Sequence, residues 1–397
     1  MDLAQAFHNG EPIRCIEMHT TGEPTRIIYA GFPALHGTLL EQRDQAQQQY
    51  DHVRKRLMLE PRGHHDMYGA IIRPETELVR SGEAHVGTLF THNGGFSTMC
   101  GHATIALGRF LVDTHDGNVF PRRNELVVRP DSQTVELNLH APCGLIRVTV
   151  PVTPDGQRSD PSRPVTFLST PAFATALQIQ IPIPTDVQWP ELGGRQSICL
   201  DVSYGGAYYA MVTAQELGFA NGLTGIDLDA VTRCVRKLKR YLESYPVIER
   251  ASQNPDARLS FLYSVMIVDH HLGTKPADAN VDGVETGLCY FADNEIDRSP
   301  TGSCVSARMA LAFAKGQRPI GQRWAYHSLV SHFFDTGAFT AEIVDVVDLP
   351  GHHAVNNQGV VVQVEGKAYY TGTSAFLVED GDVTSSSGFT MHSVVPT

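Results

Sequence analysis

A cysteine at position 100 stands at the start of a long apolar stretch, within the order Met99, Cys100, Gly101, His102. If a helix begins here, its free backbone N–H groups and its dipole favour a thiolate and lower the pKa of the cysteine. The same N–H groups can bind a carboxylate, and Gly101 lets a ligand approach the backbone closely. A thiolate beside a bound carboxylate is placed to take the proton from the α-carbon. A small buried core residue is the alternative interpretation of a free cysteine.

A second position of this kind lies about half the chain further along, where Thr301, Gly302, Ser303 and Cys304 open another apolar stretch. A threonine hydroxyl is too weak an acid to hold a negative charge at neutral pH. It can form a hydrogen bond, but it does not readily take a carbon-bound proton. Threonine is also a favoured N-cap residue, so an ordinary helix cap is the alternative interpretation. The nearby Asp297 could pair with a substrate ammonium or simply belong to the turn.

These two positions indicate two similar halves. The apolar spacing predicts one helix from Cys100 through Leu111 and another from Thr301 through Phe313, each after a polar turn. The first stretch is apolar nearly all round, which is typical of a buried helix. Two buried helices, one in each half, suggest two similar domains whose helix N-termini could face one cleft.

Strands outnumber helices in the rest of the chain. Leucines and valines at spacings of three and four predict an amphipathic helix over residues 228–242, and another helical stretch covers residues 39–59. A proline-rich segment over residues 151–164 is typical of a long loop near a domain boundary. Apolar or alternating runs predict strands at Arg26–Ala30, Thr134–Leu139, Gly144–Val152, Ile198–Val202, Ala207–Val212, Leu259–Val268, Phe339–Val347 and Val360–Val364.

Composition and charge exclude several classes of protein. The 397 residues are 42% hydrophobic and 19% charged, as in a globular chain of about two domains. The net charge of −12 argues against binding to nucleic acid or to an anionic membrane. We find neither an apolar run of about 18 residues nor an apolar secretory segment. Seven cysteines without a C-x-x-C pair favour a reducing, cytoplasmic location.

Familiar cofactor and metal motifs are missing from the sequence. No two glycines are two residues apart, which removes the G-x-G-x-x-G fingerprint, and no P-loop or H-E-x-x-H motif occurs. Three pairs of adjacent histidines begin at His64, His270 and His352. Adjacent side chains point in different directions on most elements, so we do not expect a metal site.

Several segments resemble the proline racemase family. Residues 99–102 and 297–302 are similar to its two signature motifs. The resemblance covers most of the chain in the expected order, and further similar segments are Glu17–Arg26, Glu60–Gly69, Tyr204–Ala207 and Ala368–Gly372. It implies a diaminopimelate-epimerase-like α/β (α+β) fold. In this fold two similar domains each wrap a sheet around a central helix, and the active site lies in the cleft between them.

The resemblance also implies the domain organisation and the ligands. The first domain is expected to comprise residues 1–165, with a C-terminal segment of about 356–397 returning to it, and the second domain residues 166–355. No cofactor and no metal are expected. The expected partner is a small-molecule imino acid substrate, and a homodimer is a possible assembly.

Within the family, the two catalytic positions distinguish the activities. Proline racemases and 4-hydroxyproline epimerases carry cysteine at both positions, one on each face of the α-carbon. A Cys100 and Thr301 pair resembles the branch that dehydrates trans-3-hydroxy-L-proline to 1-pyrroline-2-carboxylate. By this resemblance Cys100 is the base. The residues expected to hold the substrate carboxylate and ring nitrogen are Gly101, His102, Asp297, Gly302 and Ser303. Phe291 is expected to be the aromatic residue of the pocket.

Physical reasoning agrees with dehydration. Racemisation needs a base on one face of the α-carbon and an acid on the other, so a pair with threonine should fail at it. In trans-3-hydroxy-L-proline the hydroxyl is cis to the α-hydrogen. Cys100 could therefore take the α-proton and return it to the departing hydroxyl, while Thr301 only forms a hydrogen bond.

Two alternatives remain open from the sequence. Cys304 occupies a position where the family usually has glycine, and it could be a packing residue or a displaced second acid/base. In the latter case a proline racemase or 4-hydroxyproline 2-epimerase becomes the alternative activity. A non-catalytic protein that binds imino acids is the other alternative, although binding alone needs no thiol.

Overall fold

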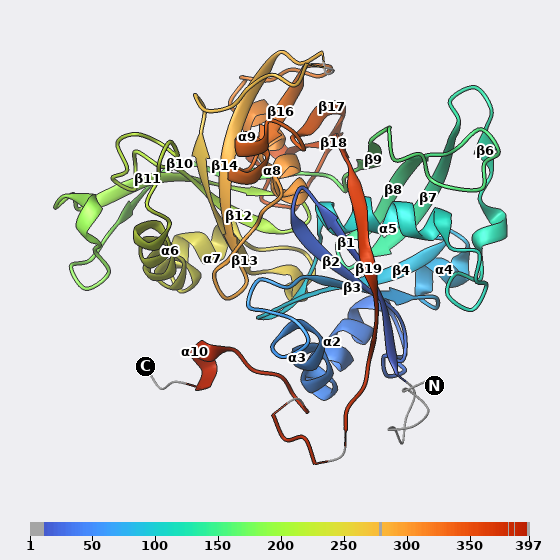
Figure 1. Cartoon of the computed structure of the whole chain (residues 1–397). Helices are drawn as coiled ribbons and strands as arrows, with labels where there is room; N and C mark the ends of the chain where they lie inside the picture. Colours follow the sequence, from blue (N-terminus) through green and yellow to red (C-terminus); the bar gives the residue numbers. More distant parts are fainter. Residues whose placement is uncertain (1–11, 278–279, 380, 385, 395–397) are drawn as a thin grey trace. The chain divides into compact units, whose positions relative to one another are not determined.

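The structure is a computed structural model that describes residues 12–277, 280–379, 381–384 and 386–394. The chain forms two compact units (Figure 1). Unit 1 contains the residues up to Thr98, His102–Thr166 and the residues from Lys367 onward. Unit 2 contains Met99–Gly101 and Phe167–Gly366. In the described part of the chain, every helix is too short or too polar to cross a membrane.

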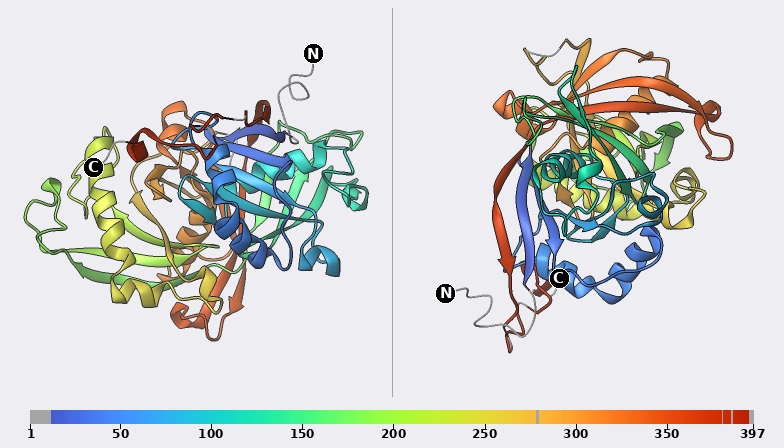
Figure 2. Two further views of the ribbon diagram at one scale, coloured as in Figure 1. Left: turned by 90° about the horizontal axis from the view of Figure 1, so that it is seen from below. Right: turned by 90° about the vertical axis from the view of Figure 1, so that its right-hand side faces the viewer.

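Unit 1 is built around the helix α5 (Gly101–Asp113). Its strands pair in the order β19-β1-β2-β3-β4-β7-β8, with parallel pairing between β2 and β3 and between β4 and β7. Their bounds are β1 (Ile13–Thr20), β2 (Glu23–Ala30), β3 (Gly69–Arg73), β4 (Val86–His92), β5 (Gly95–Ser97), β6 (Val128–Arg129), β7 (Thr134–Ala141), β8 (Gly144–Pro151) and β19 (Ala368–Phe376). The right-hand view of Figure 2 shows β19 beside the first strands of the chain.

Contacts of α5 show that this sheet curves around the helix. Gly108 faces β8, where an added Cβ would lie 3.0 Å from a methyl group of Val148. The ring of Phe110 lies 6.1 Å from that of Tyr29 on β2. Arg109 donates a hydrogen bond to the carbonyl of Ala368 at the start of β19. A helix enclosed in this way must be apolar nearly all round, as its sequence is.

Shorter helices accompany the unit 1 sheet. These are α2 (Leu39–Gln49), α3 (Asp51–Met58), α4 (Glu77–Ser81) and the terminal α10 (Met391–Val394). Leu39 of α2 and Leu57 of α3 pack in one apolar core with strand residues such as Ile71. The helical stretch predicted over residues 39–59 is confirmed, although it is divided into two helices at Tyr50, where φ is −124° and ψ is 17°. This break allows Arg54 of α3 to donate to the carbonyls of His92 and Asn93.

Unit 2 repeats the arrangement around α8 (Gly302–Ala314). Its strands pair in the order β10-β11-β12-β13-β14-β16-β17-β18, and a bridge from Ala172 to Val360 brings β18 back to the start of β10. Helix α8 packs against β10, β11, β12, β17 and β18. The bounds are β9 (Val165–Leu168), β10 (Phe173–Pro182), β11 (Ser197–Tyr204), β12 (Tyr208–Thr213), β13 (Leu262–Asp269), β14 (Gly283–Phe291), β15 (Glu295–Ile296), β16 (Arg323–His327), β17 (Phe339–Asp348) and β18 (Gln358–Gly366).

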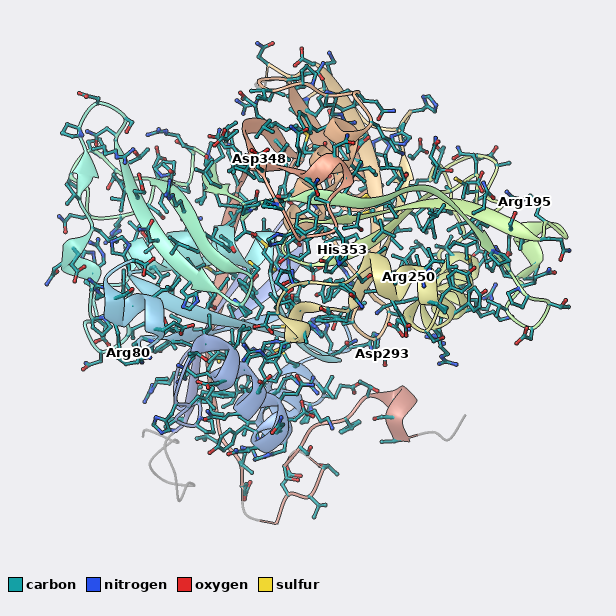
Figure 3. The ribbon with its side chains drawn as sticks, turned by 180° about the vertical axis from the view of Figure 1, so that it is seen from behind. Arg80, Arg195, Arg250, Asp293, Asp348 and His353 are labelled. Carbon is teal, nitrogen blue, oxygen red and sulfur yellow. The ribbon has the colours of Figure 1, made fainter. Side chains whose placement is uncertain are left out.

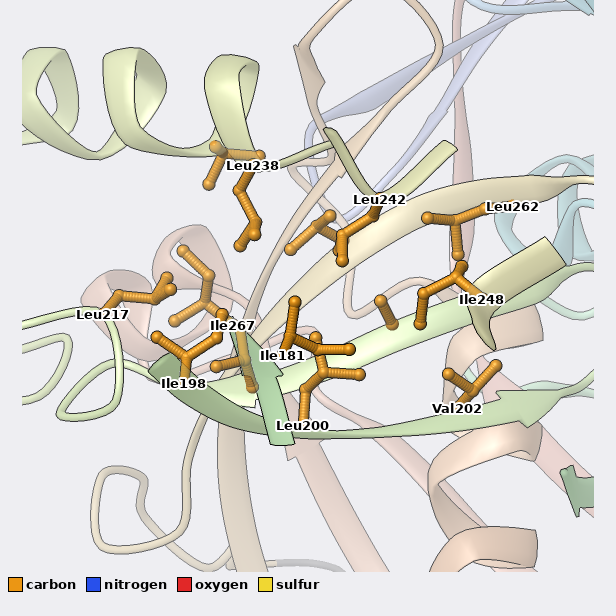
Figure 4. Close-up of a cluster of buried hydrophobic side chains, with 14 of the residues drawn as sticks. Ile181, Ile198, Leu200, Val202, Leu217, Leu238, Leu242, Ile248, Leu262 and Ile267 are labelled. Carbon is orange, nitrogen blue, oxygen red and sulfur yellow. The ribbon is translucent and has the colours of Figure 1, made fainter. Parts of the chain in front are cut away.

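The outer face of this sheet is covered by α6 (Leu228–Glu243) and α7 (Pro246–Ala251), while α9 (Leu329–Phe334) packs beside β14 and β16. Exposed charges mark the periphery, with Arg195 on the loop between β10 and β11 and Arg250 on α7 (Figure 3). Figure 4 shows Leu238 and Leu242 of α6 pointing at the strands. The predicted amphipathic helix is confirmed.

The two central helices are also confirmed. Helix α5 begins one residue after Cys100, and α8 begins one residue after Thr301. Two units of the same design, each with a sheet around a buried helix, agree with the fold class that the resemblance implies. The strand β18 belongs to unit 2, and the chain returns to unit 1 at β19.

Candidate active site

Cys100 lies at the N-terminus of a helix. Its side chain is 4% exposed, and Gly101 is the first residue of α5. Although α5 runs through unit 1, Met99, Cys100 and Gly101 belong to unit 2 by their contacts. The cysteine therefore shares a compact unit with Thr301, Gly302 and the rest of the second motif.

Gly101 and Gly302 are in direct backbone contact within unit 2. A Cβ added to Gly101 would lie 2.5 Å from the Cα of Gly302, and one added to Gly302 would lie 2.9 Å from the Cα of Gly101. Only glycine permits two backbones to approach so closely. The structure thus brings the residue after Cys100 against the residue after Thr301.

Thr301 has an unusual backbone conformation. Its φ of 63° and ψ of 78° lie in the left-handed region, which a β-branched residue rarely adopts and which costs about 1–3 kcal/mol. Although it is the N-cap of α8, its side chain makes no capping hydrogen bond. The interpretation of Thr301 as an ordinary side-chain cap is therefore wrong. Strain of this kind persists where the surrounding structure fixes a functional side chain.

The hydroxyl of Thr301 is held by Asp297. Thr301 Oγ1 donates to Asp297 Oδ2 over 2.8 Å. The backbone N–H of Ser299 donates to Asp297 Oδ1 over 2.7 Å, and the N–H of Thr301 donates to Ser299 Oγ over 3.1 Å. These three bonds link the carboxylate, the serine and the threonine in one closed turn. The turn follows the β14–β15 connection, where Figure 3 labels Asp293.

Burial sets the acidity of Asp297, which is 5% exposed. Burial raises the pKa of this carboxyl to about 6, and the hydrogen bonds from Ser299 and Thr301 oppose a larger rise. Asp297 therefore changes its charge close to neutral pH. At pH 7 and above it is mostly a carboxylate that can accept hydrogen bonds from a cationic ligand.

Two further cysteines lie near this turn. The thiol of Cys289 on β14 lies 2.9 Å from Ser264 Oγ, and burial raises its pKa to about 12. Cys304 on the first turn of α8 is fully buried, and burial raises its pKa well above the ordinary value. Both side chains remain neutral thiols at neutral pH. This arrangement favours a packing role for Cys304.

Ser303 and Phe291 are also buried in unit 2. Ser303 Oγ lies 2.6 Å from the hydroxyl of Tyr209. The ring of Phe291, at the end of β14, stacks on Tyr263 with a centroid separation of 6.0 Å. Sequence reasoning missed Tyr209 and Tyr263, because they lie on strands far from both motifs in the chain. It also missed Ser299, although this residue stands inside the second motif.

His102 belongs to unit 1. It is nearly fully buried, its carbonyl accepts a hydrogen bond from Thr20 Oγ1 over 3.0 Å, and its ring lies 4.6 Å from that of Tyr68. Burial lowers the pKa of this imidazole to about 3. His102 is therefore neutral at physiological pH.

The start of α8 can bind an anion. The first hydrogen bond of the helix runs from the N–H of Val305 to the carbonyl of Thr301. The N–H groups of Gly302, Ser303 and Cys304 consequently have no acceptor within the helix. Such N–H groups, together with the helix dipole, suit a carboxylate. Within the described residues, no group of three or more histidine, cysteine, aspartate or glutamate side chains is arranged to hold a metal ion.

Comparisons with known sequences match nearly the whole chain. The family model described as proline racemase matches residues 15–390. Trans-3-hydroxy-L-proline dehydratase from Homo sapiens is 38% identical over 380 residues, which cover 94% of this chain and 93% of the relative. The protein of the same name from Colwellia psychrerythraea is 34% identical and covers 93% of this chain and 90% of its own length.

Comparisons with solved structures give the same fold. A probable proline racemase from Agrobacterium radiobacter superposes with a TM-score of 0.75 at 21% identity, covering 96% of this chain and 97% of the other. A hydroxyproline epimerase from Agrobacterium vitis, bound to trans-4-hydroxy-L-proline, superposes with a TM-score of 0.71 at 20% identity and covers 96% of each chain. At these identities the likeness concerns the fold, and it confirms the expected fold class.

Proposed function

Since the chain belongs to the proline racemase family, we propose that it dehydrates trans-3-hydroxy-L-proline to 1-pyrroline-2-carboxylate without a cofactor. The observation that carries this proposal is the backbone contact of Gly101 with Gly302. Because Cys100 precedes the first glycine and Thr301 precedes the second, this contact brings the two helix starts together. The relatives named trans-3-hydroxy-L-proline dehydratase support the choice of substrate.

Substrate binding follows from the charges at the start of α8 and in the turn before it. The N–H groups at the start of α8 that have no acceptor within the helix receive the substrate carboxylate. Asp297, as a carboxylate, accepts hydrogen bonds from the ring ammonium. Ser303 and Phe291 complete the pocket within unit 2, and a substrate-binding role of His102 stays a prediction. These roles fix the imino acid with its α-carbon between Cys100 and Thr301.

Chemistry then proceeds on one face of the ring. The Cys100 thiolate takes the α-proton, and the electron pair of the broken C–H bond forms the double bond between the α- and β-carbons. The bond from the β-carbon to the hydroxyl oxygen breaks, and the new thiol returns its proton to that oxygen, so that water leaves. The enamine product tautomerises to 1-pyrroline-2-carboxylate. Cys100 ends as a thiolate, ready for another turnover.

Proline racemase and 4-hydroxyproline 2-epimerase activity need a second acid/base on the opposite face. We infer that Thr301 occupies that position, and Cys304 is buried and held as a neutral thiol. A protein that only binds imino acids has no use for a cysteine at the helix N-terminus. Both alternatives are therefore less well supported than dehydration.

We also infer that the enzyme works in the cytoplasm. All seven cysteines are free thiols, including the partly exposed Cys143 and Cys199, which suits a reducing compartment. The imino acid remains the proposed partner, and the homodimer stays a prediction.

The substitution Cys100→Ser tests the proposed role directly. A serine hydroxyl does not ionise at neutral pH, so we expect dehydration to slow by about 10²–10⁴-fold, the usual contribution of an acid/base group. Cys199→Ser is the matched control, because Cys199 lies on β11 and is partly exposed. The rate should be unchanged in the control. A Cys100→Ser enzyme with near-normal dehydration would contradict the proposed role.

A further inference from the structure

The hydrogen bond between Thr301 and Asp297 has a direction that matters for the reaction. An ionised carboxylate can only accept, so the hydroxyl hydrogen of Thr301 lies on the line from Oγ1 to Asp297 Oδ2, which are 2.8 Å apart. Oγ1 then has only lone pairs to present in other directions. Besides Asp297, this side chain also meets the Cys289 thiol. We therefore expect a substrate bound beside Thr301 to meet a proton acceptor rather than a proton donor on this side.

This direction is fixed by the surrounding turn. Ser299 binds Asp297 Oδ1 through its N–H and binds the N–H of Thr301 through its hydroxyl. The left-handed backbone of Thr301 adds a further constraint, because a β-branched side chain in that conformation has few rotamers. Neither the carboxylate nor the hydroxyl can turn away without breaking this set of bonds.

From this geometry we propose that Asp297 decides whether the face of the α-carbon next to Thr301 can be protonated. As a carboxylate, Asp297 withholds the Thr301 hydroxyl hydrogen and leaves elimination as the only outcome. As a carboxylic acid, it releases that hydrogen toward the substrate and permits inversion. The inference rests on the proposed function. It makes Asp297 a positioning residue for stereochemistry in addition to its contact with the ring ammonium.

The step that inversion requires balances within this pair. After Cys100 has taken the α-proton, the Thr301 O–H bond breaks and a new C–H bond forms on the opposite face of the α-carbon. At the same time the Asp297 O–H bond breaks, and its proton restores the threonine hydroxyl. Asp297 is left as a carboxylate and Cys100 as a thiol. The product from trans-3-hydroxy-L-proline is its α-epimer, cis-3-hydroxy-D-proline.

The described groups whose charge acts on Asp297 come from its own turn, from β14 and from α8. Arg298 lies within the turn, and its positive charge favours the carboxylate form of Asp297. Cys289 on β14 and Cys304 on α8 remain thiols, since burial raises the pKa of each. Lys239 of α6 is partly desolvated, which lowers its pKa, and its ammonium lies against the carbonyl of Ala292. The pKa of Asp297 is about 6, so its acid form grows below that pH.

The test is the ratio of α-epimer to dehydration product formed from trans-3-hydroxy-L-proline, measured by chiral chromatography at partial conversion. The wild-type enzyme should form epimer at about pH 5 and at least 10-fold less of it, relative to the dehydration product, at about pH 8. Both products form in the same sample, so a pH effect that changes only the overall rate alters both equally. The ratio of epimer to dehydration product then stays constant.

Three variants sharpen the test. Asp297→Asn cannot gain or lose a proton, so its ratio should be independent of pH. Thr301→Val has no hydroxyl and should form no epimer at either pH. Thr301→Ser keeps the hydroxyl and should keep the pH dependence of the ratio, whatever its rate.

Dehydration without epimer at about pH 5, or an equal ratio at both pH values in the wild type, would overturn this inference alone. An Asp297→Asn enzyme that keeps the pH dependence would do the same. Absence of both dehydration and epimer would overturn the proposed function and this inference with it.

Discussion

Replacing Asp297 with asparagine should stabilise the fold while impairing the enzyme. Asp297 is almost completely buried, and it is surrounded by the turn that holds Thr301 and Ser299. An asparagine has nearly the same shape and carries no charge. Its side-chain oxygen can still accept one of the two hydrogen bonds that the carboxylate now accepts.

The magnitude follows from the pKa. Burial raises the pKa of Asp297 from 3.8 to about 6, which corresponds to about 3 kcal/mol against the charged form in the folded state. Because the folded-state pKa is raised, the neutral form stabilises the fold fully below pH 3.8, and this contribution is lost as the pH rises through about 6. At about pH 8 the asparagine variant should therefore be more stable than the wild type by up to about 3 kcal/mol.

Urea unfolding at about pH 8 and about pH 4 measures this difference. The advantage of Asp297→Asn should be present at the higher pH and nearly absent at the lower one. Asp186→Asn is the matched control, because Asp186 is exposed in the same unit and should show no such difference. A variant that is less stable than the wild type at about pH 8 would refute the reasoning. Its dehydration rate should fall, because an amide binds the ring ammonium less well.

Three further substitutions test other parts of the structure. Cys304→Ala should keep the dehydration rate within a few-fold and lower the free energy of unfolding by about 1 kcal/mol; loss of turnover would restore Cys304 as an acid/base. Glu285→Gln removes the carboxylate between two buried arginines and should cost about 3–5 kcal/mol in urea unfolding; an unchanged midpoint would contradict this. Gly101→Ala places a Cβ 2.5 Å from Gly302 Cα and should reduce kcat/KM by about 10-fold or more, whereas Gly117→Ala, which meets nothing within 4 Å, should not.

The sequence predicts the central helices well because their signals are local. A small residue after a polar turn, followed by a stretch that is apolar nearly all round, locates the starts of α5 and α8 within one residue. The amphipathic spacing of α6 is equally local, and its buried face includes Val231 and Leu238. Each of these features depends on neighbours within a few turns of the same segment.

The structure of the second motif depends on tertiary contacts and could not be predicted in this way. Threonine before a helix indicates a side-chain cap, yet the hydroxyl of Thr301 binds Asp297 instead. Its left-handed backbone precedes Gly302, which packs against Gly101 from a distant part of the chain. The break at Tyr50 also stands next to tertiary contacts, since Arg54 donates to the carbonyls of the distant His92 and Asn93.

The central claim is tested most directly by proton NMR of the purified protein with trans-3-hydroxy-L-proline in heavy water. We expect the substrate signals to disappear while those of 1-pyrroline-2-carboxylate appear. An unchanged substrate, together with exchange of the α-proton of L-proline or 4-hydroxyproline for deuterium and formation of their α-epimers, would contradict it and indicate a racemase or epimerase.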